Sequence, residues 1–125
     1  MRRDHNRELG STGEDLAAVW LGQHDFRIVQ RNLRTPYGEL DIIAERRGEI
    51  HIIEVKTRHG TGFGDPLEAI DRRKQEHLRR ATAAVLASGL YGLPRPCRGV
   101  HVDAISVLAD GHSEPVIRFL EDVLV

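Results

Sequence analysis

The ionisable residues Asp41, Glu54 and Lys56 lie among the isoleucines of two apolar runs in the segment GELDIIAERRGEIHIIEVKTR, residues 38–58. Because strand side chains alternate between faces, Glu54 and Lys56 share one face of the second run. If the two runs form a hairpin that turns symmetrically about residues 47–48, Asp41 of the first run faces Glu54. The Cβ atoms of directly opposed residues lie about 5 Å apart, and two carboxylates that close repel unless a cation or a proton lies between them.

A hard divalent cation is the natural occupant of such a carboxylate pair, and Mg²⁺ with oxygen ligands at about 2.1 Å is the best match. Lys56 is then placed to hold an anionic substrate or a metal-bound water. Two alternatives stay open. Charged residues on a strand commonly form only its solvated face, so that Glu39 and Lys56 would be a cross-strand ion pair, and an odd-length turn would shift the register by one residue.

The strands that must position these residues are predicted from apolar runs bounded by turn residues. Three strands are expected in the first half of the chain, at residues 25–32, 39–45 and 49–57. One or two further strands are expected at residues 99–108 and 114–124, around the turn ADGHSE.

A first helix is predicted to begin at Ser11, because Ser11 and Glu14 have the form of a capping box, and to end at Gly22. Residues 1–10 before it are expected to be a flexible polar arm. Glu14 also lies on the helix face that carries Leu21, so it can equally point inward, and the capping role and an inward role both stay open.

A second, long helix is predicted over residues 65–88, with Asp65 as its N-cap, Pro66 in its first turn and Gly89 at its end. The resulting order is α-β-β-β-α-β-β. This order favours an α/β domain in which helices cover a mixed sheet.

The composition of the chain limits the classes of protein that need to be considered. With 125 residues it forms one domain, and its formal net charge of −1 excludes a polycation that binds nucleic acid by bulk charge. The single cysteine, Cys97, excludes an internal disulfide framework and fits the cytoplasm. The sequence has no apolar run long enough to span a membrane and no secretory signal, and its histidines show no metal-ligand spacing.

Any contact with nucleic acid must therefore come from a local basic surface, and the second helix offers one. Lys74 falls within the apolar stripe of this helix, where it can either contact a phosphate or extend to solvent. Four arginines flank the stripe, namely Arg72, Arg73, Arg79 and Arg80. They form either a track for a phosphate backbone or an ordinary solvated helix surface.

Two other features have weaker interpretations. The run GTGFG, residues 60–64, lacks the spacing of a dinucleotide-binding loop, and a loop beside the site, with Phe63 and Tyr37 as stacking groups, fits it better. Asp103 interrupts an apolar strand, which favours a polar network, for instance with Arg98, over catalysis.

An acid at position 41 followed by EVK at positions 54–56 resembles the signature of restriction-endonuclease-like nucleases. More closely, GELDIIA and IHIIEVKTR after GEDLAAVWL resemble the YraN-like family of small bacterial proteins, which are similar to archaeal Holliday-junction resolvases. The resemblance covers residues 10–123. It implies a restriction-endonuclease-like domain over residues 11–125, with a central mixed β-sheet flanked by helices.

The resemblance also implies roles for individual residues. Asp41 and Glu54 would bind a metal, with the carbonyl oxygen of Val55 as a further ligand. Lys56 would orient the attacking water, and Glu14 would be the additional acid of the resolvase branch. The family pattern, together with the position of Lys74 near the helix start, also favours a phosphate contact for this lysine. Apart from the resemblance, the candidates for contact with nucleic acid are the basic residues Arg58, Arg72, Arg73 and Arg79.

The expected function is hydrolysis of phosphodiester bonds in DNA, including branched or Holliday-junction DNA, by an endonuclease that uses Mg²⁺ or, in its place, Mn²⁺. Such an ion lowers the pKa of bound water and clamps phosphate oxygens. A homodimer is a candidate assembly for this function. The alternatives are a nucleic-acid-binding module without catalysis of its own and a nucleotide binder that uses the glycine loop.

Overall fold

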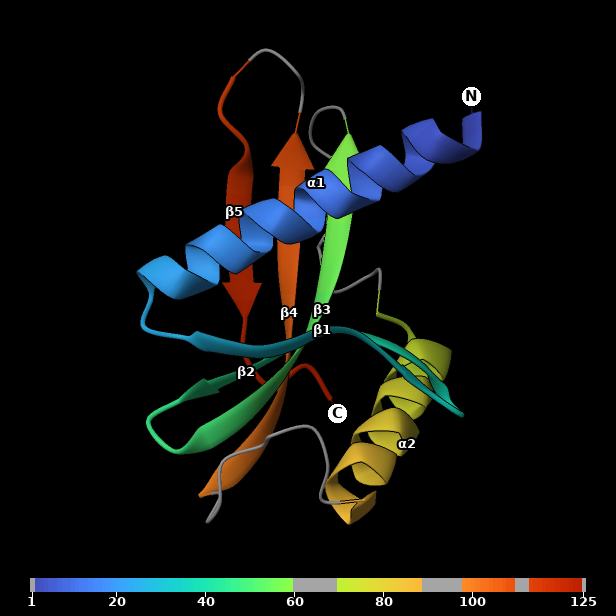
Figure 1. Cartoon of the computed structure of the whole chain (residues 1–125), viewed down its shortest axis with the longest axis vertical. Coiled ribbons are helices and arrows are strands. Elements are labelled where there is room, and N and C mark those ends of the chain that lie inside the picture. Colours follow the sequence, from blue (N-terminus) through green and yellow to red (C-terminus); the bar gives the residue numbers. More distant parts are fainter. Residues whose placement is uncertain (1, 60–69, 89–97, 110–112, 125) are drawn as a thin grey trace.

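The computed structural model describes residues 2–59, 70–88, 98–109 and 113–124, and side chains from residue 12 onward. Seven elements follow one another along the chain (Figure 1): α1 (Arg2–Gln23), β1 (Arg27–Thr35), β2 (Gly38–Arg46), β3 (Glu49–His59), α2 (Arg72–Ser88), β4 (Gly99–Ala109) and β5 (Val116–Leu120). This order confirms the predicted succession α-β-β-β-α-β-β.

The five strands form one sheet in the order β1-β2-β3-β4-β5. The pair β3 and β4 is parallel, whereas the other three neighbouring pairs are antiparallel. Parallel neighbours need a long crossover connection, and the segment that contains α2 supplies it. The predicted α/β class with a mixed sheet is therefore confirmed.

The two helices cover opposite faces of this sheet. Ile53 of β3 belongs to the apolar cluster that contains Ala17 and Leu21 of α1, and in Figure 1 α1 crosses in front of β3, β4 and β5. The neighbouring residue Ile52 belongs to the cluster that contains Leu78 of α2. Because adjacent strand residues point to opposite faces, the sheet separates two cores, which we call the α1 face and the α2 face.

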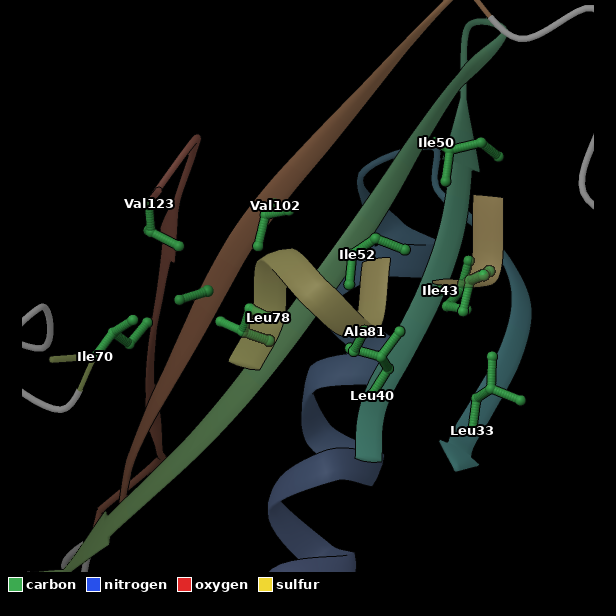
Figure 2. Packing of buried hydrophobic residues seen from close by; sticks show 12 residues of the cluster. Leu33, Leu40, Ile43, Ile50, Ile52, Ile70, Leu78, Ala81, Val102 and Val123 are labelled. Carbon is green, nitrogen blue, oxygen red and sulfur yellow. The ribbon is translucent and has the colours of Figure 1, made fainter. Parts of the chain in front are cut away.

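The core on the α2 face fixes the helix that carries Lys74. Ile43, Ile52 and Val102 of the sheet pack in one cluster with Leu78 and Ala81 of α2 (Figure 2). All five side chains are buried. Burial of each large apolar side chain stabilises the fold by about 1.5 to 3 kcal/mol, so this packing holds α2 firmly against β2 and β3.

The hairpin of β2 and β3 has the register that the sequence predicts. Ile43 pairs with Ile52, and Ala44 pairs with His51. The turn residues Arg47 and Gly48 have φ angles of 56° and 78°, as tight hairpin turns require. The ladder of paired residues ends at Ile42 and Ile53.

The crossing of α1 over β3 depends on a glycine. A Cβ atom on Gly13 would lie 1.9 Å from Oγ1 of Thr57, which is far inside van der Waals contact. Only a residue without a side chain therefore lets α1 approach β3 this closely. The close approach also fixes the next residue of the helix, Glu14, above this part of the sheet.

The start of the first helix was predicted wrongly. Helix α1 begins at Arg2, so Ser11 lies inside the helix and the capping role of Glu14 does not apply. No proline interrupts residues 2–10, so nothing in this stretch requires the helix to begin at Ser11. The flexibility of these residues stays a prediction.

The start of the second helix was also predicted wrongly. Helix α2 begins at Arg72, and its N-cap is Asp71, whose Oδ1 accepts a hydrogen bond from the backbone N–H of Lys74 at 2.8 Å. Asp71 can take this role because it lies three residues before Lys74, whose backbone N–H is in the first turn of the helix and needs an acceptor outside the helix. The predicted markers Asp65, Pro66 and Gly89 lie outside the described residues.

Candidate active site

A candidate site lies where β2 and β3 stop pairing. One residue beyond the last ladder pair, Oδ2 of Asp41 accepts a hydrogen bond from the backbone N–H of Val55 at 2.8 Å. A side-chain oxygen thus takes the place that a main-chain carbonyl would have in a continued ladder. This bond fixes the Asp41 carboxylate beside the strand segment that carries Glu54 and Lys56.

The electrostatic state of Asp41 agrees with the predicted closeness to Glu54. Burial and, after it, the negative charge of Glu54 raise the pKa of Asp41 from its ordinary value of 3.8 to about 7, against the opposing effect of the Val55 hydrogen bond. Glu14 of α1 adds to the same effect, while Lys74 opposes it. The three carboxylates therefore form one interacting group, drawn from three elements.

Glu54 is the most buried of these carboxylates, with only 4% of its surface exposed. Its Oε1 lies 3.1 Å from Nζ of Lys74 and 3.7 Å from Nζ of Lys56. Its Oε2 is buried and, among the residues that the structure describes, has no hydrogen-bond partner. A buried polar atom without a partner costs about 1 to 3 kcal/mol. A cation bound to this oxygen, through one of its lone pairs, would remove that cost.

Glu14 faces the sheet instead of capping a helix. Nη2 of Arg31 lies 3.7 Å from Oε1 of Glu14, and the Asn32 amide, in the orientation that satisfies both of its ends, donates to Glu14 and to Glu39 at 3.0 Å. Burial raises the pKa of Glu14, and the positive charge of Arg31 opposes this. The inward role of Glu14, which the sequence left open, is the one that the geometry favours.

The predicted basic residues divide into two groups. Lys74 and Lys56 converge on Glu54, and both stay partly exposed. Arg79 and Arg80 instead form ion pairs with Glu76 of the same helix, at 3.9 Å and 3.0 Å.

Three other predicted basic residues have different surroundings. Arg72 and Arg73 are exposed at the start of α2, next to Lys74, and Arg58 is partly buried near the end of β3. They therefore stay candidates for contact with nucleic acid. Tyr37 is exposed, whereas Phe63 and most of the glycine-rich loop lie outside the described residues.

A second polar cluster, which the sequence reasoning missed, lies at the N-terminal end of β3. One ligand atom each from Glu49, His51 and His101 lie within 4.8 Å of one another, and in the described part of the chain this is the one group of three such side chains. The spacing of the histidines along the chain gave no sign of this group. Fifty residues separate the two histidines in the sequence, and only the parallel register of β3 and β4 pairs them.

Two further carboxylates hold these histidines. Nδ1 of His51 lies 2.6 Å from Oδ2 of Asp103, and Nδ1 of His101 lies 2.8 Å from Oδ1 of Asp122. Asp103 is fully buried, and burial raises its pKa, although the N–H of Asp122 and the His51 ring oppose this. The predicted polar network around Asp103 exists, but its side-chain partner is His51 and not Arg98, whose backbone N–H binds the carbonyl of Gly48.

The mixed sheet with helices on both faces and the buried carboxylates paired with lysines define an α/β domain with a candidate acidic active site. The sequence places this domain among known proteins. Its residues 13–107 match the model of the uncharacterised protein family UPF0102, and the chain belongs to this family, which is the YraN-like family that its motifs resemble.

Relatives of the chain extend over most of its length. A UPF0102 protein of Syntrophomonas wolfei subsp. wolfei is 43% identical over 110 residues, which cover 87% of this chain and 92% of the relative. A UPF0102 protein of Leifsonia xyli subsp. xyli is 45% identical over 118 residues, which cover 94% and 96% of the two chains. The family assignment therefore applies to the whole domain.

Among solved structures, the chain is similar to that of Pyrococcus furiosus SfsA in complex with Ca²⁺. The TM-score is 0.43 at 17% identity, and the match covers 93% of this chain and 63% of the SfsA chain.

In the described ranges, neither helix has the length and apolar character to cross a membrane.

Proposed function

We propose that this protein is a divalent-metal-dependent endonuclease of restriction-endonuclease-like fold that hydrolyses phosphodiester bonds in DNA. The observation that carries the proposal is the state of Glu54. This buried carboxylate contacts two ammonium groups through one oxygen, while its other oxygen has no partner among the described residues. Asp41, held by the N–H of Val55, lies beside it.

These residues fit a hard divalent cation, for which Mg²⁺ is the expected ion and Mn²⁺ a substitute. The unpartnered oxygen of Glu54 and the raised pKa of Asp41 both indicate that the site holds more negative charge than its lysines neutralise. A bound dication would neutralise this charge. Asp41, Glu54 and the carbonyl oxygen of Val55 would hold the ion. When bound, it would supply a more acidic water and a clamp for phosphate oxygens.

The two lysines would bind an anionic substrate at the site. Lys56 and Lys74 extend from a buried carboxylate to the surface, with about a third of each side chain exposed. Their ammonium groups can therefore hold a phosphate at the edge of the site while Glu54 fixes their positions. We assign Lys56 to orienting the attacking water, and Glu14 to a supporting acid whose charge acts on Asp41.

The nucleic-acid backbone would follow the start of α2. Arg72 and Arg73 are exposed next to Lys74. Arg58 lies two residues after Lys56 on β3. Branched DNA, including four-way junctions, is the substrate that the resolvase resemblance favours. Cleavage of two strands of a junction requires two sites, so a homodimer belongs to this proposal.

A cleavage assay tests the proposal. The full chain is incubated with end-labelled single-stranded, duplex, flapped and four-way-junction DNA, with Mg²⁺, Mn²⁺ or a chelator. We expect metal-dependent cuts that disappear in Glu54→Gln and persist in Glu76→Gln, a matched variant of an exposed glutamate on α2. Cleavage that is equal in the wild type and in Glu54→Gln would show that the mechanism is wrong.

One observation favours a second function, a nucleic-acid-binding module without catalysis. Within the described residues, the acids Glu14, Asp41 and Glu54 do not gather three side-chain ligand atoms as closely as the histidine cluster does. Lys56 and Lys74 could bind phosphate without any ion. Such a module would bind DNA with strong salt dependence and would produce no cuts with either metal.

A further inference from the structure

We infer that Glu49, His51 and His101 form a second metal site, for a borderline transition-metal ion of the Zn²⁺ class, at the end of the sheet away from Glu54. Glu49 and His51 precede Glu54 by five and three residues on β3, which at about 3.3 Å per residue places them about 16 Å and about 10 Å from it along the strand. The two sites therefore share no ligand.

The sheet brings the two imidazoles together. His51 of β3 and His101 of β4 are direct partners in the parallel register. Their rings stack, with centroids 4.6 Å apart and planes 15° from parallel. Glu49 lies on the same face of β3, since it is two residues from His51, and its carboxylate contacts Nε2 of His101.

Hydrogen bonds orient both rings through the same nitrogen. Each Nδ1 contacts a carboxylate, Asp103 for His51 and Asp122 for His101. Histidines that bind metals characteristically give their other ring nitrogen to a carboxylate, which fixes the ring and raises its basicity. We therefore assign both Nε2 atoms as ligand atoms, and an ion would replace the present contact between Nε2 of His101 and the Glu49 carboxylate.

The outer carboxylates are themselves held in place. The backbone N–H of Asp122 donates to Oδ1 of Asp103 at 2.9 Å, so the two carboxylates belong to one network. His51 and Asp103 are buried, whereas His101 and Glu49 are partly exposed. The cluster therefore has a rigid inner side and an outer side through which an ion can enter.

A small cavity of about 170 Å³ lies at the cluster, lined by Arg46, Arg47, Glu49, His51, His101 and Glu121. It has room for an ion and a few water molecules, because one water occupies about 30 Å³ of the liquid. Three protein ligands would leave a fourth position open toward this cavity, which is the arrangement of reactive rather than structural zinc sites. Two arginines at the rim favour an anion in that position.

The ligand set selects the type of ion. Two imidazoles and one carboxylate suit Zn²⁺ and its transition-metal neighbours, whereas Mg²⁺ and Ca²⁺ prefer oxygen alone. The all-oxygen set around Asp41 and Glu54 has the opposite preference. The beginning and the middle of β3 are thus expected to bind different ions.

Metal titration of the full-length, chelator-treated and dialysed chain tests the inference. The probe is ZnCl₂ in isothermal titration calorimetry, and CoCl₂ gives a visible absorption spectrum of the bound ion. We expect one specific site per chain that His101→Ala abolishes, while His77→Ala, at an exposed position on α2, leaves it intact. Asp122→Asn keeps all three ligands and should weaken binding by about 10- to 100-fold.

The Asp122→Asn variant keeps the test decisive if His101→Ala does not fold, because Asp122 is exposed and its side chain reaches the cluster through His101. A cobalt spectrum that changes in Asp122→Asn supports the site. Zinc affinity that is the same in the wild type, His101→Ala and Asp122→Asn would overturn it, as would a wild-type chain that binds no zinc. Both readouts are independent of DNA cleavage, so failure here leaves the proposed nuclease untouched.

Discussion

Nζ of Lys74 lies 3.1 Å from Oε1 of Glu54, and this ion pair joins α2 to β3 at the edge of the core on the α2 face. Glu54 is almost completely buried, whereas the lysine reaches the surface. A buried charge that loses its partner is strongly unfavourable. The pair therefore links the stability of the domain to the geometry of the candidate site.

Replacement of the lysine tests this link. We expect Lys74→Met to lower the free energy of unfolding by about 1 to 3 kcal/mol, because the Glu54 carboxylate stays buried with less compensation. In the Glu54→Gln background the same replacement should cost less, since no buried charge remains. Urea denaturation of the four proteins in chelator measures this coupling, and an equal cost in both backgrounds would contradict it.

The raised pKa of Asp41 predicts how stability depends on pH in the metal-free protein. The unfolded chain releases the Asp41 proton near pH 3.8, whereas the folded chain holds it to about pH 7. The folded state thus binds more protons between these values, and its stability falls as the pH rises through this range. Asp41→Asn should make this fall shallower, as measured by urea denaturation at pH 4.5, 6 and 8. A fall of unchanged steepness in the variant would show that Asp41 does not titrate as described.

Occupation of the acidic site by a metal should raise the melting temperature. An ion that binds the folded chain alone stabilises it in proportion to the logarithm of its concentration. We expect Mg²⁺ to raise the midpoint of thermal unfolding in the wild type and in Glu76→Gln, and to have no such effect in Glu54→Gln. The same shift in all three proteins would place the ion elsewhere.

The exposed arginines at the start of α2 should carry part of the salt dependence of DNA binding. Each lost phosphate contact lowers the slope of log affinity against log salt by about 0.9. We expect the double variant Arg72→Ala, Arg73→Ala to lose slope, and Arg80→Ala, whose side chain pairs with Glu76, to keep it. Fluorescence anisotropy at several salt concentrations gives the slopes. Equal slopes in the wild type and both variants would exclude a track along this helix end.

The close crossing of α1 over β3 predicts a severe effect of one methyl group. Gly13→Ala would place a Cβ atom 1.9 Å from Oγ1 of Thr57, so the helix must shift, at a cost of about 1 to 3 kcal/mol. Thr57→Ala should restore much of this loss. Gly22→Ala on the same helix meets no atom within 4 Å and serves as the control, and thermal unfolding compares the four proteins. An unchanged stability of Gly13→Ala would refute the crossing.

The hairpin was predictable because its signals are local. The Arg47-Gly48 turn and the alternation of apolar residues fix the register of β2 and β3, and Ile43 pairs with Ile52 as that register requires. The closeness of Asp41 to Glu54 follows from the same few residues. Local signals of this kind survive folding because no distant contact competes with them.

The missed features depend on distant contacts or on competing signals. The His51 and His101 pair exists only because the long crossover after β3 returns β4 in a parallel register, and no spacing in the sequence records this register. Likewise, the sequence offers both Asp65 and Asp71 as suitable helix caps. In the structure Asp71 caps α2, next to Ile70, which is buried in the core. Lys74 is an intermediate case. Helix periodicity predicted that it lies on the apolar face of α2, but only the fold shows that its partner is Glu54.

The hydrogen bond from the Val55 amide to the Asp41 carboxylate makes the main chain of β3 a spectroscopic reporter of the site. An amide in a sheet ladder donates to a neutral carbonyl, but the Val55 amide donates to a group whose charge changes with protons, ions and substrate. The nitrogen and proton chemical shifts of this single amide will therefore follow every such event. One resonance, observed without any label on the ligand, can order the steps by which the site fills.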